Sequence, residues 1–350
     1  MAIPSDIRAA FRAGTAIPAH PLALDQDKKL SERHQRALAR YYVAAGAGGI
    51  AVGVHSTQFQ IRDPKIGLYE PVLRLAAHTI DAAAAKAGRP VMRIAGVCGP
   101  TAQAVREASL AAGLGYHAAL LSLAGVPGSL ADLVAHCRAV AEVIPVIGFY
   151  LQPAVGGRVL PFAFWRDFAA IPNVIGIKMA PFNRYRTLDV VRGVAASGRD
   201  DIALYTGNDD NIVADLVTPF RLDGGRELRV VGGLLGQWCV WTQPAVALLA
   251  RCRALVASGA PIPAELLALG ARLTDANAAV FDAANDFRGC LPGLHYILHG
   301  QGLMPGLWCL DDHEVLSPGQ AQEIDRVRHA YPDLIDDAFV AAHRDRWLAD

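Results

Sequence analysis

The sequence predicts a (β/α)8 barrel with a C-terminal helical extension. Eight short runs of apolar, often β-branched residues alternate with longer amphipathic stretches, and eight strand–helix units in roughly 250 residues are the number that closes such a barrel. The runs lack the polar–apolar alternation of half-exposed strands, which indicates a parallel sheet covered by helices. An open, doubly wound sheet is the rival architecture, but no G-x-G-x-x-G turn follows the first strand.

The elements follow one another in a regular order. The expected strands cover residues 15–18, 49–53, 90–95, 117–123, 143–150, 173–178, 202–206 and 228–233. The helices that follow them are expected at 31–45, 70–87, 101–113, 129–142, 161–170, 186–197, 209–218 and 242–258. After these come three further helices, at 262–284, 286–299 and 318–347. We therefore predict a barrel over residues 1–258 that carries the site, and a helical segment over 259–350 packed on its flank.

Composition favours a compact protein that handles a small molecule. Apolar residues make up 53% of the 350 and charged residues 19%, so a sizeable core is expected. The 33 basic residues balance the 33 acidic ones, and no Lys/Arg cluster suggests a nucleic-acid partner. Residues 230–250 are uncharged and long enough to span a bilayer. Their Gly-Gly pair, two glutamines and Pro244 instead indicate a strand, a turn and a helix start, so no membrane association is expected.

The cysteines point to a reducing compartment. Six cysteines lie far apart without a C-x-x-C pair, and the N-terminus lacks the apolar core of a signal peptide. We expect reduced thiols and a cytoplasmic location. No H-E-x-x-H or paired-cysteine spacing occurs either, so neither a metal nor an organic cofactor is expected.

The expected sixth strand ends on a lysine. In "NVIGIK" (173–178) the apolar run stops at Lys178, and the carboxyl ends of barrel strands carry the chemistry in barrel enzymes. Desolvation lowers the pKa of a lysine, and the neutral amine can attack a ketone to form a Schiff base. The alternative is a lysine that reaches from the strand end into solvent.

Tyr150 ends the preceding expected strand, in "VIPVIGFY". Because neighbouring parallel strands end at one rim, we expect its phenol to converge with Lys178 and to shuttle protons there. A tyrosine that packs against a rim loop is the alternative.

Six stretches together resemble the dihydrodipicolinate synthase / N-acetylneuraminate lyase family of class I pyruvate-type aldolases. They are "TAIPAHPL" (15–22), "GAGGIAVGVHSTQ" (46–58), "GFYLQPAVGG" (148–157), "NVIGIK" (173–178), "YTGNDD" (205–210) and "VVGGLLG" (230–236). The Tyr-x-x-Pro and Ile-Lys strand ends, 28 residues apart (150 to 178), are the most specific. The resemblance implies that Lys178 forms the Schiff base and that Tyr150 shuttles protons.

The turn after the second strand departs from the family pattern. The family has Gly-Thr-Thr-Gly-Glu or Gly-Ser-Thr-Gly-Glu where this chain has Gly53-Val54-His55-Ser56-Thr57. We expect backbone N–H groups with Ser56 or Thr57 to bind the keto-acid carboxylate. His55 is expected to replace the hydroxyl relay, to hydrogen-bond the phenol or the substrate and to titrate near neutrality. A histidine bonded to loop carbonyls is the alternative.

Two further departures concern the synthase itself. Its members carry an arginine soon after Tyr-x-x-Pro, where this chain has Val155, with Arg158 displaced. They also contribute a tyrosine across the dimer from the loop after the fourth strand, which reads "SLAGVPGS" here. We therefore do not expect dihydrodipicolinate synthesis.

Polar residues after the sixth and seventh strands complete the candidate site. Asn183 and Arg184 would bind a distal carboxylate or phosphate, although Arg184 also fits a surface position at a helix start. Asn208 and Asp209 would bind substrate hydroxyls, although Asp209 also fits a helix N-cap. Gly233, at the end of the eighth strand, is the last substrate-binding candidate.

These residues predict a Schiff-base lyase, an aldolase or dehydratase, acting on a 2-keto acid such as a 2-keto-3-deoxy sugar acid. Deamination or hydrolysis of a cyclic imino acid is the second possibility, and a non-catalytic keto-acid-binding protein is the third. The resemblance implies a homodimer or homotetramer.

Overall fold

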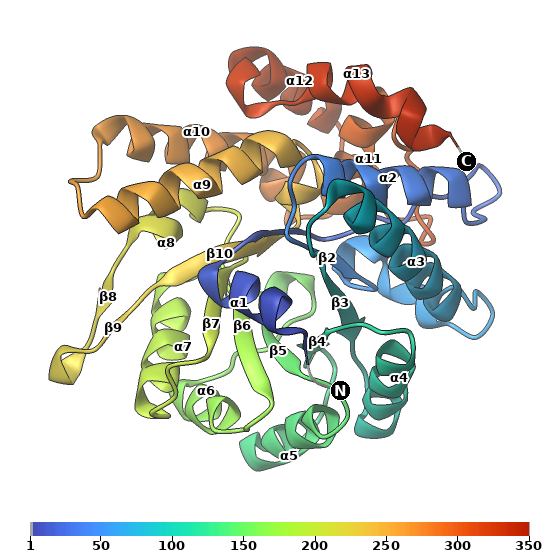
Figure 1. Ribbon diagram of the computed structural model, residues 1–350. Coiled ribbons are helices and arrows are strands. Elements are labelled where there is room, and N and C mark those ends of the chain that lie inside the picture. Colours follow the sequence, from blue (N-terminus) through green and yellow to red (C-terminus); the bar gives the residue numbers. More distant parts are fainter. Residues whose placement is uncertain (1–2, 350) are drawn as a thin grey trace.

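Eight parallel strands close into a barrel, which confirms the predicted fold class (Figure 1). The computed structural model describes residues 3–349. The barrel strands are β1 Ala16–Pro18, β2 Gly49–Val52, β3 Met92–Val97, β4 Ala118–Ser122, β5 Val146–Leu151, β6 Val174–Ala180, β7 Ala203–Thr206 and β10 Val230–Leu235. They pair in the order β1-β10-β7-β6-β5-β4-β3-β2. The circle closes where Ala19 and Ala51 form a parallel bridge and the His20 N–H donates to the Ala51 carbonyl at 2.8 Å.

Helices cover the outside of the barrel and continue beyond it (Figure 1). The helices that follow the strands are α2 Glu32–Ala44, α3 Tyr69–Ala87, α4 Thr101–Gly113, α5 Leu130–Ala141, α6 Phe162–Ala169, α7 Arg184–Ala196, α8 Ile212–Val217 and α9 Thr242–Ser258. The C-terminal helices are α10 Ala264–Val280, α11 Cys290–Gly300, α12 Gln320–Ala330 and α13 Asp337–Leu348.

One helix was not expected and closes one end of the barrel. α1, Ser5–Ala13, precedes β1, and its Ile7 and Phe11 join the core inside the barrel. The Phe11 ring stacks on Tyr205 with centroids 4.7 Å apart, and the Tyr205 hydroxyl donates to the Phe11 carbonyl at 2.7 Å. The amino-terminal end is therefore filled, and a ligand has to enter from the carboxyl end.

Side chains of the barrel strands divide between two cores. One fills the barrel and includes Ile147, Phe149 and Tyr205. The other lies between the strands and the helices and includes Tyr150 and Trp165. Because strand side chains alternate between faces, a residue's place in this alternation decides whether it reaches a site inside the barrel.

The pairing of β5 with β6 contains an irregularity. Val146 pairs with Val174, an offset of 28 residues (146 to 174), whereas the next residue, Ile147, pairs with Gly176, an offset of 29 (147 to 176). The additional residue on β6 is Ile175, as in a β-bulge. Beyond this point every β6 side chain is opposite a different β5 partner from the one that an unbroken register would give.

Three segments differ from the sequence expectations or refine them. The helix expected at 286–299 begins only at Cys290, and the one expected at 318–347 is split into α12 and α13 around Pro332, whose ring cannot continue a helix. Between α8 and β10 the chain forms a hairpin of β8 Phe220–Arg221 and β9 Glu227–Leu228. Residues 230–250 form β10, a turn and the start of α9, and no helix in residues 3–349 combines the length and apolarity needed to cross a membrane.

Candidate active site

A cavity opens at the carboxyl ends of the barrel strands. The ends of β5, β6 and β7, the turn after β2 and the segment after α10 form its walls. About 630 Å³ of space between its walls, open mouth included, is not filled by protein atoms. Its polar lining residues are His55, Ser56, Gln152, Lys178, Asp209 and Cys290.

Lys178 lies in this cavity and is almost completely buried. The residue is 7% exposed, and its Nζ lies 4.3 Å from the centroid of the Phe149 ring. β6 continues for two residues to Ala180, so the lysine lies just inside the rim. Burial lowers the pKa of Lys178 to about 8, and the negative charge of Asp209 opposes that shift. A lysine with this pKa is partly neutral near neutral pH, as nucleophilic attack requires.

Gly207 leaves the space that the lysine stem occupies. A Cβ at this position would lie 2.6 Å from Cε of Lys178 and 2.9 Å from Cβ of Ala180. Any side chain here would therefore displace the amine. The sequence analysis included this glycine in "YTGNDD" without giving it a role; its position directly after a strand was the available signal.

Tyr150 does not meet Lys178, and the expected convergence of their side chains is wrong. Lys178 is opposite Phe149 on β5, whereas Tyr150 is opposite Met179. The Tyr150 ring packs on Trp165 with centroids 5.1 Å apart, in the core outside the barrel wall. Its hydroxyl accepts a hydrogen bond from the Leu160 N–H at 3.2 Å. The physical cause is the bulge on β6: with the offset of 28 residues maintained, Tyr150 would be opposite Lys178.

Asp209 is the second charged residue of the cavity. It is 8% exposed, and the one hydrogen bond to its carboxylate from residues 3–349 comes from the Gln237 N–H at 3.3 Å. Burial raises the pKa of Asp209 to about 7, with the charge of Lys178 opposing the shift. The carboxyl group and the amine thus have pKa values of about 7 and about 8, both close to neutral pH, which suits proton transfer.

His55 lines the cavity as a neutral imidazole. Burial, and after it the charge of Lys178, lower the pKa of His55 to about 4. The expectation that it titrates near neutrality is therefore wrong, and so is its expected bond to Tyr150, because that phenol faces away. Its ring lies 6.0 Å from Phe59, centroid to centroid.

Ser56 and Thr57 shape the turn that carries His55. Ser56 Oγ donates to the Ala19 carbonyl at 2.8 Å, and Ser56 lines the cavity. Thr57 Oγ1 donates to the His20 carbonyl at 2.7 Å and accepts from the Gly53 N–H at 2.9 Å. Thr57 is fully buried and holds the turn instead of lining the cavity. His55 and Ser56 begin a 3-10 turn, whose first N–H groups have no acceptor inside the turn.

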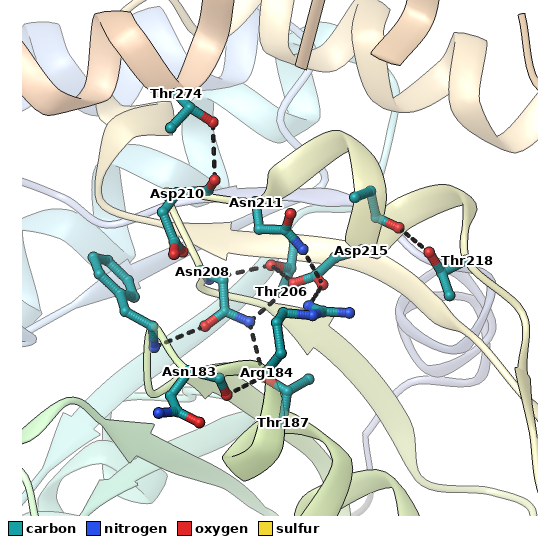
Figure 2. A network of polar contacts seen from close by, with 12 residues as sticks. Asn183, Arg184, Thr187, Thr206, Asn208, Asp210, Asn211, Asp215, Thr218 and Thr274 are labelled. Atoms are coloured by element: carbon teal, nitrogen blue, oxygen red, sulfur yellow. Dashed lines mark hydrogen bonds and ion pairs between the residues drawn. The ribbon is translucent and has the colours of Figure 1, made fainter. Parts of the chain in front are cut away.

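A buried carboxylate, Asp215 on α8, organises the polar residues beside the cavity (Figure 2). It accepts hydrogen bonds from Thr206 Oγ1 at 2.7 Å, Asn208 Nδ2 at 3.0 Å and Asn211 Nδ2 at 3.1 Å. Arg184 forms an ion pair with it. Arg184 and Asn208 therefore bind Asp215, and neither lines the cavity.

Two asparagine side chains of this region accept hydrogen bonds from backbone N–H groups. Asn208 Oδ1 accepts from the Phe182 N–H at 3.1 Å. Asn183 caps α7, accepting from the Arg186 N–H at 3.2 Å. Asp209 is not the N-cap of α8, because Asn211 holds that position. Of the polar substrate-binding candidates after β6 and β7, Asp209 is the one that lines the cavity.

Gly233 has a packing role. A Cβ at this position would lie 2.6 Å from the Trp238 ring. Gly233 does not line the cavity, so this position does not support the expectation that it binds the substrate.

The C-terminal segment supplies cavity residues that the sequence analysis missed. Phe281, Phe287, Cys290 and Leu294 lie after α10 or in α11 and line the cavity together with barrel residues. Burial raises the pKa of the Cys290 thiol well above its usual range, so the thiol stays protonated. No motif marks these positions, which is why sequence reasoning placed the segment on the flank alone. Within residues 3–349, no group of three or more His, Cys, Asp or Glu side chains is placed to hold a metal ion.

Comparisons with known proteins agree with the barrel fold. A search of curated proteins found no match. Among solved structures, dihydrodipicolinate synthase from Aquifex aeolicus has a TM-score of 0.73 at 15% identity, covering 92% of this chain and 99% of that one. The synthase from Acinetobacter baumannii in complex with pyruvate has a TM-score of 0.71 at 19% identity, with coverage of 92% and 99%. N-acetylneuraminate lyase from Fusobacterium nucleatum has a TM-score of 0.71 at 14% identity, again with coverage of 92% and 99%.

At these identities the structural matches establish the fold. The sequence profile described as Dihydrodipicolinate synthetase family matches residues 13–219, a range that contains the lysine strand, the Gly207–Asp209 turn and the His55 turn. More than half of the chain thus fits one profile, and the chain belongs to the dihydrodipicolinate synthetase family.

Proposed function

We propose that this protein is a Schiff-base lyase, an aldolase or dehydratase, acting on a 2-keto acid, with Lys178 as nucleophile and Asp209 as proton-transfer group. Family membership supports a Schiff-base lyase with pyruvate-type substrates. The observation that carries the proposal is the buried amine of Lys178 in a cavity, with its pKa lowered to about 8.

The reaction begins at the keto carbon. The neutral amine of Lys178 attacks C2, and loss of water gives a protonated imine. In this proposal the backbone N–H groups of His55 and Ser56, which have no acceptor inside their turn, bind the C1 carboxylate. Neutral His55 adds no charge of its own, so it acts through shape and hydrogen bonding.

Asp209 takes the role that sequence reasoning gave to Tyr150. In an aldolase reaction the Asp209 carboxylate removes the proton of the C4 hydroxyl, the C3–C4 bond breaks and its electron pair moves into the imine. The aldehyde leaves, the resulting enamine is protonated at C3, and water releases pyruvate from Lys178. In a dehydratase reaction a C3 proton of the imine passes to the Asp209 carboxylate, which gives the enamine, and the C4 hydroxyl then leaves as water when the carboxyl group returns that proton. A carboxyl group with a pKa of about 7 can accept and return a proton near neutral pH.

Dihydrodipicolinate synthesis is not part of this proposal. Val155, at the position where the resemblance places the synthase arginine, lines the cavity. Arg158 donates to the Val126 carbonyl at 2.6 Å and does not line the cavity. A carboxylate on the aldehyde partner would find no guanidinium there.

Reductive trapping tests the proposal. The protein is incubated with pyruvate and cyanoborohydride, and intact mass and peptide mapping locate the adduct. The chain has five lysines, so assignment is simple. We expect one reduced-pyruvate adduct on Lys178, its loss in Lys178→Ala and its retention in the control Lys86→Ala. No adduct, or an adduct on another lysine, contradicts the proposal.

Assembly and location stay predictions. The expected homodimer or homotetramer can be tested by sedimentation of the purified protein, and the expected cytoplasmic location by fractionation of cells. The boundary between a barrel of residues 1–258 and a helical segment of residues 259–350 also stays a prediction, which limited proteolysis can test.

A further inference from the structure

The cavity has one polar end and otherwise apolar walls. His55, Asp209 and Cys290 interact electrostatically with Lys178, which places these polar lining residues around the amine. Ser56 adjoins His55, and Gln152 is the one remaining polar lining residue. The apolar wall is formed by Leu151, Val155, Phe182, Phe281, Phe287 and Leu294, together with Ala19, Val54, Phe149 and Ala180.

The arginine and asparagine side chains near the cavity that could bind a polar substrate are bonded to other protein groups instead. Arg184 pairs with Asp215, and Arg158 donates to the Val126 carbonyl. Asn208 has its side-chain oxygen on the Phe182 N–H and its nitrogen on Asp215. Among residues 3–349, no arginine lines the cavity. Beyond the residues around the amine, a polyhydroxylated chain or a second anionic group would therefore find Gln152 as its one polar side-chain partner among residues 3–349.

Two phenylalanines of the wall are held in an uncommon backbone conformation. Phe182 has φ +47° and Phe287 has φ +65°, a region that non-glycine residues rarely adopt. Their rings meet edge to face with centroids 5.7 Å apart. One follows β6 and the other follows α10, so this contact joins the barrel to the C-terminal segment across the cavity wall. Such backbone conformations persist only where the surrounding structure imposes them, and they cluster at ligand sites.

From this arrangement we infer that the substrate is a 2-keto acid whose distal end is an aliphatic or aromatic group, so that the aldehyde released or added is apolar. The inference rests on the proposed function and names its substrate class. Each hydroxyl buried without a partner costs about 1–3 kcal/mol on protein-derived scales. An apolar group gains about 25 cal/mol per Å² of apolar surface buried. Both effects favour an apolar chain over a sugar chain.

Two substrates that share the pyruvate half test the inference. We compare 4-hydroxy-2-oxo-4-phenylbutanoate with 2-keto-3-deoxygluconate and measure pyruvate release. We expect kcat/KM to be higher for the phenyl compound by about 10² or more, since partner-free burial of even two hydroxyl groups is sufficient for that factor. Equal values, or preference for the sugar acid, overturn the inference.

A readout that needs no turnover is the concentration at which each compound slows pyruvate trapping at Lys178. We expect the phenyl compound to protect at a concentration at least about tenfold lower. If both compounds slow the trapping at the same concentration, the inference about the apolar substrate is overturned. The proposed function still stands in that case, because pyruvate is trapped at Lys178. Absence of pyruvate trapping overturns both.

A variant links the preference to the wall. Phe287→Asn places a polar side chain in the cavity, and asparagine tolerates the left-handed conformation. We expect the ratio of the two kcat/KM values to fall at least about tenfold, and pyruvate trapping at Lys178 is measured in the same variant to show that its amine still reacts. The control Ile262→Asn alters an exposed residue that does not line the cavity and should leave the ratio as it is. An unchanged ratio in Phe287→Asn contradicts the inference that the apolar wall sets the substrate preference.

Discussion

Two buried aspartates, six residues apart in sequence (209 to 215), have opposite surroundings. Asp215 is fully buried and receives hydrogen bonds from three side chains and an ion pair from Arg184 (Figure 2). Asp209 is 8% exposed, faces the cavity and receives one backbone hydrogen bond from the described residues. The first carboxylate is fully partnered, whereas the second keeps hydrogen-bonding capacity for a ligand.

The difference in surroundings suits the two aspartates to different tasks: Asp215 positions its neighbours, and Asp209 can take part in proton transfer. A buried carboxylate whose oxygens accept several hydrogen bonds holds its neighbours in place. A buried carboxylate with few donors has a raised pKa and can exchange a proton. Asn208 connects the two: it binds Asp215 and immediately precedes Asp209. The Asp215 network thus fixes the turn that presents Gly207 and Asp209 to Lys178.

The largest effect is expected at the cavity carboxylate. Asp209→Asn should lower kcat by about 10²–10⁴-fold, the usual loss for a general acid–base, because the amide cannot take the C4 hydroxyl proton. Steady-state kinetics with the preferred 4-hydroxy-2-keto acid measure this. Pyruvate trapping at Lys178 should persist. Turnover within a few-fold of the parent protein would remove Asp209 from the mechanism.

Asp215 should affect stability more than chemistry. Asp215→Asn removes the partner of Arg184 and part of the hydrogen bonding of Thr206 and Asn208, so we expect unfolding free energy to fall by about 1–3 kcal/mol. Thermal and denaturant unfolding measure the loss. Arg184→Ala is the matched control: its side chain is 44% exposed, so its loss should stay near 1 kcal/mol or below. A larger loss in Arg184→Ala than in Asp215→Asn would contradict this account of the network.

The smallest effect is expected at Tyr150. Tyr150→Phe removes one hydrogen bond, from the Leu160 N–H, in the core outside the barrel wall. We expect kcat to stay within about threefold and stability to fall by about 1 kcal/mol. A loss of kcat comparable to that of Asp209→Asn would show that the phenol reaches the cavity during turnover.

Sequence reasoning recovered the barrel and the lysine for physical reasons. Buried parallel strands leave uninterrupted apolar runs, so their number and order were readable, and a lysine at the end of such a run stands out as costly to bury. Asp209 was found by its position after β7. The role of Asp209 in proton transfer was not predicted, because its raised pKa depends on its burial and on how few hydrogen-bond donors surround it in the folded protein.

The errors also have physical causes. Tyr150 was misplaced because one additional residue, Ile175, shifts the β5–β6 register, and a one-residue shift exchanges the two faces of the wall. Arg184 and Asn208 were misassigned because their partner Asp215 lies in a helix further along the chain. Phe287 was missed because its place in the cavity depends on the path between α10 and α11.

The central claim is that Lys178 and Asp209 act on each other inside one desolvated cavity. The rate of adduct formation with pyruvate and cyanoborohydride, followed as a function of pH, tests it directly. The rate should rise with pH as Lys178 loses its proton, with a midpoint near its pKa of about 8. Because the negative charge of Asp209 raises the lysine pKa, the midpoint should move to lower pH in Asp209→Asn. A midpoint near the ordinary lysine value of about 10.4, or one that is unchanged or moves to higher pH in Asp209→Asn, would contradict the claim.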